Sequence, residues 1–329
     1  MRREIPSIAA MAALLVGSQI AAIALSPLFF GAGFQAFQRP EDVTNTVIYL
    51  IMILAFTAVI LGLVRYKRQN LAKYVIMASI FITLAFILLL PLLYALDYAT
   101  GGTADLVLLE NVATVLAFAT AAGLVYLLVK FPEWYVVDAI GITTAAGVTA
   151  ILGISFGTLP AILLLIALAF YDAWAVYRTK HMITLADELT SQRLPILLVI
   201  PKKAGYSFRQ QKSLKEQVAS GEEREAMFVG LGDLIIPGIM AVSAFTFPPL
   251  KPGATPADPW VPDIRTILGV PSNLLIALFV VFGCLVGFLA LMRFVLRGNP
   301  QAGLPLLNGG ALVAFVIMNL LVYGTVHIL

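Results

Sequence analysis

Two aspartates stand inside long apolar stretches of this sequence. Asp172 lies in Leu-Ala-Phe-Tyr-Asp-Ala-Trp, and Asp233 lies in Val-Gly-Leu-Gly-Asp-Leu-Ile. An ionisable group is costly inside a bilayer and marks a functional site by default. Two carboxyl groups that meet in a low dielectric cannot both ionise easily, so one keeps its proton and the other acts as a base. Such a pair can activate water for attack on a peptide carbonyl and then protonate the leaving nitrogen.

The composition places this pair in lipid. Of the 329 residues, 60% are hydrophobic and only 12% are charged, whereas a soluble domain carries about 25% charged residues. The single cysteine, Cys284, excludes an internal disulfide, and the two histidines are too few and too far apart to suggest a histidine metal site. We therefore expect no metal, no organic cofactor and no nucleic-acid partner.

Charge-free stretches predict nine transmembrane helices, because each span takes about 20 predominantly apolar residues. Glycines and a proline in Gly153–Pro160 separate the fifth helix from the sixth. The expected spans are 7–30, 43–64, 74–96, 111–129, 134–152, 160–178, 226–247, 267–292 and 306–327. The predicted fold class is an all-α polytopic membrane protein.

The chain divides into three parts on this reading. Residues 1–190 hold six helices and Asp172, residues 191–225 form a cytoplasmic loop, and residues 226–329 hold three helices and Asp233. With the N-terminus cytoplasmic and the C-terminus outside, 18 of the 21 Lys and Arg residues fall in cytoplasmic segments, as the positive-inside rule requires. The N-terminal apolar run also has features of a signal peptide, but its length favours a retained span.

The two aspartates are expected to lie at similar depths. Asp172 is six residues from the cytoplasmic end of the sixth span, and Asp233 is eight residues from the cytoplasmic start of the seventh. At about 1.5 Å per residue, these depths are roughly 9 and 12 Å. The spans are consecutive and antiparallel, so the carboxyl groups can meet. Gly230 and Gly232 are expected to allow a close helix approach beside Asp233.

The same two aspartates would suit a second class of protein. Paired intramembrane carboxyl groups also carry protons or cations through transporters. Transporters commonly contain inverted repeats with paired broken helices, and no clear repeat is visible here. Aspartate-dependent ion flux in proteoliposomes would favour a proton- or cation-coupled transporter.

Three short motifs resemble those of the presenilin and signal peptide peptidase family. Tyr171-Asp172 resembles the family's Tyr-Asp motif, and Gly230-Leu231-Gly232-Asp233 resembles its Gly-x-Gly-Asp motif. Pro305-Leu306-Leu307 resembles its Pro-Ala-Leu motif, with leucine where alanine is usual. The order of the motifs, the loop between the sixth and seventh helices and the nine-helix count also match. The resemblance covers nearly the whole chain and is closest to the archaeal members.

The resemblance implies an intramembrane aspartyl endopeptidase with Asp172 and Asp233 as its catalytic pair. It implies substrate-binding roles for Tyr171, Gly230, Leu231, Gly232, Pro305, Leu306 and Leu307. The implied partners are transmembrane-helix substrates and the lipid bilayer, with a homo-oligomer allowed. The implied location is a prokaryotic, archaeal cell membrane. A preprotein-signal peptidase of the related Gly-x-Gly-Asp class would hold its aspartates closer to the cytoplasmic surface.

Cleavage within a membrane also needs a locally extended substrate, which can add as a strand to an exposed edge. The apolar run from Pro195 to Pro201 is too short to span and predicts a strand or a membrane-surface segment. Leu306-Leu307 would offer free backbone near the site if the ninth helix begins after it. Asp138 is expected at the membrane interface, and Cys284 is expected to serve packing.

Overall fold

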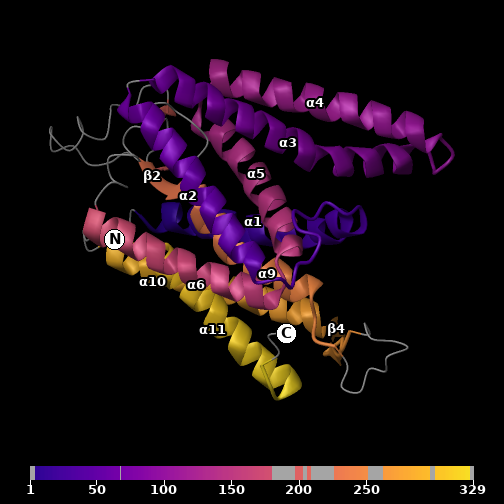
Figure 1. Ribbon diagram of the computed structural model, residues 1–329, viewed down its shortest axis with the longest axis vertical. Coiled ribbons are helices and arrows are strands. Elements are labelled where there is room, and N and C mark those ends of the chain that lie inside the picture. Colours follow the sequence, from indigo (N-terminus) through magenta and orange to yellow (C-terminus); the bar gives the residue numbers. More distant parts are fainter. Residues whose placement is uncertain are drawn as a thin grey trace. The chain divides into compact units, whose positions relative to one another are not determined.

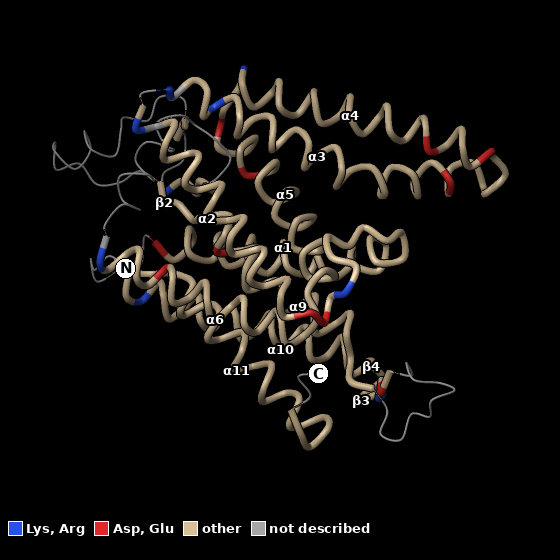
Figure 2. Tube along the Cα trace, viewed as in Figure 1, with Lys and Arg blue, Asp and Glu red and all other residues tan. Residues whose placement is uncertain are grey.

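The computed structural model describes residues 4–66, 68–179, 197–202, 206–208, 226–250, 262–296 and 301–326. In these ranges eight helices are long and apolar enough to cross a membrane (Figure 1). They are α1 (Ile5–Gly31), α2 (Thr44–Arg65), α3 (Gln69–Ala99), α4 (Leu106–Lys130), α5 (Trp134–Ser155), α6 (Thr158–Trp174), which continues into the π-helix η1 (Ala175–Thr179), α10 (Ser272–Val295) and α11 (Leu304–Tyr323). A shorter apolar helix, α9 (Leu231–Thr246), is the ninth. Figure 2 shows that many of the charged residues lie near the helix ends. The length and apolar composition of the helices confirm the polytopic all-α fold class.

The seventh span differs from its expected form, a helix over 226–247. Its first five residues instead form strand β2 (Ala226–Gly230), which pairs antiparallel with β1 (Leu197–Pro201). The 16 residues of α9 rise only about 24 Å, which is less than the roughly 30 Å of a hydrocarbon core. The extended strand can supply the missing length, because it rises about 3.3 Å per residue.

Strand β1 confirms that the short apolar run before Pro201 is extended. Leu197 lies opposite Gly230, and Pro201 lies opposite Ala226. Residues 195 and 196 of the expected run lie outside the described residues, as does most of the charged loop that follows it. The pairing gives each strand backbone partners along one of its two edges.

The chain separates into two compact units. The first comprises Met1–Ile51, Thr149–Ile183 and Gly232–Leu329, and the second comprises Met52–Val148 and Thr184–Leu231. Helix α10 of the first unit contacts both α1 and α11, and α11 also contacts α6. Glycines allow the closest of these approaches: a Cβ atom on Gly283 would run into the backbone of Gly310, and one on Gly287 would run into the carbonyl of Leu306.

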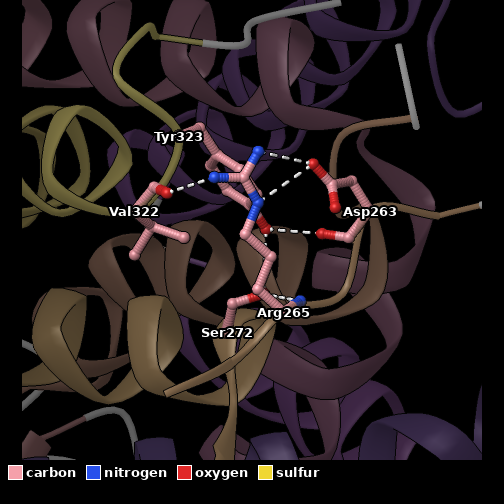
Figure 3. A network of polar contacts seen from close by, with 5 residues as sticks. All are labelled: Asp263, Arg265, Ser272, Val322 and Tyr323. Atoms are coloured by element: carbon pink, nitrogen blue, oxygen red, sulfur yellow. Dashed lines mark hydrogen bonds and ion pairs between the residues drawn. The ribbon is translucent and has the colours of Figure 1, made fainter. Parts of the chain in front are cut away.

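A polar cluster joins α10 and α11 at one end of the first unit (Figure 3). The Arg265 guanidinium donates to Asp263 Oδ2 at 3.0 and 3.2 Å and to the carbonyl of Val322 at 2.8 Å. The Tyr323 hydroxyl donates to the carbonyl of Asp263 at 2.9 Å, and Ser272 lies 3.0 Å from the same hydroxyl. The short hairpin of β3 (Thr266–Ile267) and β4 (Val270–Pro271) follows this cluster. These bonds tie the start of α10 to the end of α11.

The second unit packs the β1–β2 sheet against α3, α4 and the first part of α5. Its buried core contains aliphatic residues of all these elements, including Leu84, Leu128, Ile140 and Val199. Asp138, which was expected at the membrane interface, lies in the first part of α5 and is buried by the protein, with only 6% of the residue exposed. Its carboxyl accepts a hydrogen bond from the backbone N–H of Val199 at 2.7 Å, which compensates its burial.

Candidate active site

Asp172 lies in the last turn of α6 and is 6% exposed. Its Oδ2 accepts a hydrogen bond from the backbone N–H of Leu304 at 3.0 Å, and the N–H of Gly303 faces the same carboxyl. Leu304 is the first residue of α11, and the first N–H groups of a helix have no partner within it. Asp172 therefore caps α11, although the two residues are 132 positions apart in the chain.

Asp233 is the third residue of α9 and is half-buried. A Cβ atom built on Gly303 would stand 3.1 Å from its Oδ1 and 3.3 Å from its Oδ2. The missing side chain of Gly303 therefore gives the Asp233 carboxyl its room. Since Asp172 binds the N–H of the next residue, both predicted aspartates converge on Gly303 and Leu304. All of these groups belong to the first unit.

The third motif takes a form that the sequence did not predict. Helix α11 begins at Leu304 with Pro305 in its first turn, a position where proline is favoured because its missing N–H would be unpaired anyway. The N–H groups of Leu306 and Leu307 both bond to the carbonyl of Gly303. The expectation of free backbone at Leu306-Leu307 is therefore wrong, because these residues lie inside the helix.

The side chains of the motif have different surroundings. Leu307 is fully buried, whereas Pro305 and Leu306 are half-buried. The Leu306 carbonyl lies where α11 meets Gly287 of α10. The aspartates are therefore contacted by the two residues just before the motif: Gly303 lies beside Asp233, and Leu304, the first residue of α11, donates to Asp172.

The residues around Asp233 are arranged differently from the expected close helix approach. A Cβ atom on Gly232 would meet no described atom within 4 Å, so the expectation that Gly232 allows tight packing is wrong. Gly230 ends strand β2. Leu231 is buried and lies with Leu198 around the place where a Cβ on Gly141 would stand. Tyr171 is half-buried, and its ring lies 6.5 Å from that of Trp174.

Gln19 of α1 contacts the first part of α9, next to Asp233 in the chain, and sequence reasoning missed it. It is 1% exposed, and its Nε2 lies 3.5 Å from the carbonyl of Leu234 and 3.3 Å from the sulfur of Cys284. Pro237 has no N–H to donate to the carbonyl of Asp233 four residues earlier. Gln19 thus adds a hydrogen bond from α1 to the turn of α9 that lies between Asp233 and Pro237. The available signal was an amide in an otherwise apolar span, since such groups bond between helices.

The arrangement can perform acid–base chemistry without a bound metal. Among the described residues, no three His, Cys, Asp or Glu side chains gather into a group that could hold a metal ion. Two carboxyl groups beside one backbone segment can share a proton and titrate as a pair. A water molecule between them would be activated by the ionised member, while the protonated member would donate to the carbonyl oxygen of a peptide.

Comparison with known proteins gives consistent results. A sequence model described as "Signal-peptide peptidase, presenilin aspartyl protease" matches residues 12–324. Two solved structures of a presenilin family intramembrane aspartate protease, in C222 and P2 crystals, are each 33% identical to this chain. The first has a TM-score of 0.62 and aligns over 95% of this chain and 99% of its own. The second has a TM-score of 0.61, with 95% and 97% covered. No curated protein matches.

Proposed function

The chain belongs to the family of signal-peptide peptidases and presenilin aspartyl proteases and is an intramembrane aspartic endopeptidase, and we propose that Asp172 and Asp233 are its catalytic pair. The observation that carries this assignment is their convergence on Gly303 and Leu304. Both residues come from the apolar helices α6 and α9. Carboxyl groups are rarely placed in such helices without a function.

The proposed reaction needs only the two aspartates and water. One carboxylate removes a proton from the water, whose oxygen attacks the peptide carbonyl, and the other carboxyl donates its proton to the carbonyl oxygen. Collapse of the tetrahedral intermediate breaks the C–N bond, and a proton passes to the leaving nitrogen. The hydrogen bonds from the backbone to Asp172 hold that side chain in one orientation.

We propose that the substrate adds as an extended strand to the outer edge of β2. Strand β2 ends at Gly230, only three residues before Asp233, so its end lies within roughly 10 Å of that residue along an extended chain. Among the described residues the sheet has only these two strands, so no described strand pairs with the outer edge of β2. Backbone groups within a membrane must find partners in protein or water. Pairing with a substrate would satisfy them and present its backbone for cleavage.

The proposal extends to topology and setting. The charge distribution supports a cytoplasmic N-terminus and an outside C-terminus. The site then opens toward the cytoplasm, and the favoured substrates are spans with an outside N-terminus. Resemblance to archaeal members supports a prokaryotic, archaeal cell membrane as its location, with assembly into a homo-oligomer allowed.

The direct test is cleavage of a single-span peptide by the purified protein in bilayers. We expect Asp172→Asn and Asp233→Asn each to lower kcat by at least about 10²- to 10⁴-fold, the contribution of a positioned acid or base. The wild-type pH profile should be bell-shaped, because one group must be protonated and the other ionised. Asp105→Asn is the matched control, since Asp105 caps α4 and asparagine caps equally well. Substantial cleavage by either folded active-site variant would reject the catalytic pair.

A further inference from the structure

The hydrogen bond from Val199 to Asp138 shows which backbone groups of β1 point away from β2. In an antiparallel pair, opposite residues alternate between pairs that exchange hydrogen bonds and pairs that do not. Val199 lies opposite Phe228, but its N–H is bonded to Asp138. Val199 and Phe228 therefore form a non-bonded pair, and the flanking pairs hold the strands together.

This parity places particular backbone groups on each outer edge. On β1, the residues whose backbone N–H and C=O groups point away from β2 are at positions 197, 199 and 201. On β2, the residues whose backbone groups point away from β1 are Ala226, Phe228 and Gly230. Two of the three β1 positions cannot donate to an added strand. The N–H of Val199 is occupied by Asp138, and Pro201 has none.

We propose that Asp138 is a positioning residue for proteolysis, which closes the outer edge of β1 and anchors the sheet so that β2 alone receives the substrate. This inference rests on the proposed addition of substrate to β2. The Asp138 carboxyl is buried in α5, and its 2.7 Å bond to β1 is at the short end of the range for N–H···O contacts. A single edge fixes which substrate residues pair and therefore which bond is cut.

A second carboxyl group near the start of α5 provides an internal comparison. Glu133 accepts hydrogen bonds from the Ser207 hydroxyl at 2.9 Å and from the N–H of Phe208 at 3.2 Å. It therefore holds the segment that follows β1, while Asp138 holds the strand itself. Loss of Glu133 should loosen this attachment without opening the edge of β1.

The experiment compares Asp138→Leu, Asp138→Asn and Glu133→Leu with the full-length wild type in bilayers. Measured quantities are KM, kcat, thermal stability and the cut positions, found by mass spectrometry of a single-span peptide. We expect Asp138→Leu to raise KM about tenfold, the effect of losing one hydrogen bond, and to add cuts at neighbouring bonds. Asp138→Asn keeps an accepting oxygen and should retain the wild-type KM and cut positions. Glu133→Leu should lower thermal stability while leaving KM and the cut positions unchanged.

A wild-type KM and wild-type cut positions in folded Asp138→Leu would overturn the inference and leave Asp138 a purely structural role. The same shifts in Asp138→Asn or in Glu133→Leu would also overturn it. If Asp138→Leu fails to fold, Asp138→Ala is measured instead with the same expectations, because alanine preserves the helix. Cleavage by the wild type that is lost in Asp172→Asn shows that the proposed function holds, so a negative result for Asp138 rejects only this inference. Absence of wild-type cleavage would reject both.

Discussion

Gly303 shows how much a single residue decides at this site. Its N–H faces Asp172, while the position that its side chain would take lies 3.1 Å from Asp233 Oδ1. Both carboxyl groups are therefore held against a residue outside the three sequence motifs. The motifs identify Asp172 and Asp233, but they give no indication that Gly303 lies between them in space.

Gly303→Ala should lower kcat by about 10-fold or more, because the added Cβ would displace the Asp233 carboxyl, and small displacements of reacting groups have large effects on rate. The measurement is kcat for a single-span peptide, with thermal unfolding measured in parallel.

Gly309→Ala is the matched control in the same helix. A Cβ on Gly309 would meet no described atom within 4 Å, so activity should be unchanged. Helix stability should rise slightly, by about 0.5–1 kcal/mol. Equal activity of Gly303→Ala and Gly309→Ala would contradict the role assigned to Gly303.

At the scale of the elements, the change from strand β2 to helix α9 places Asp233 at the first turn of a short helix. The other half of the site depends on α11, whose start is fixed against α10 by small residues. Gly287 lies where a side chain would meet the Leu306 carbonyl, and Gly283 lies against Gly310. The position of Leu304, and with it the hydrogen bond to Asp172, thus depends on close packing of α10 and α11.

Gly287→Ala should destabilise the protein by about 1–3 kcal/mol, the usual cost of overpacking, and should also lower kcat by moving the start of α11. Thermal unfolding and peptide cleavage measure the two effects. Gly17→Ala in α1 is the control, since its Cβ would meet no described atom within 4 Å. A Gly287→Ala protein with wild-type stability would show that α10 and α11 are not packed this tightly.

At the scale of the whole molecule, the membrane determines which surfaces are exposed. Many large apolar side chains are exposed along the helices, among them Ile51, Met52, Val115 and Phe170, and such surfaces are stable only in lipid. The proposed direction in which the chain crosses the bilayer rests on the distribution of its Lys and Arg residues. Tyr66 precedes α3 and Thr103 follows it, so these two residues are expected on opposite sides of the membrane.

Labelling with a membrane-impermeant maleimide in intact cells tests this orientation. Thr103→Cys should react from outside, whereas Tyr66→Cys should react only after permeabilisation, because the loop before α3 is expected in the cytoplasm. The wild type provides the background, since its single cysteine, Cys284, is fully buried. The reverse pattern of labelling would invert the proposed topology and the expected orientation of substrates.

The sequence by itself determined the membrane class, the positions of most helices and the identity of Asp172 and Asp233 as candidates. These follow from local properties: apolar length, charge and short motifs. Only the tertiary structure decided that residues 226–230 form a strand, that α11 begins at Leu304, and that Asp138 is buried against Val199. Each of these depends on a backbone group finding a partner from a distant segment, and no local pattern specifies that partner.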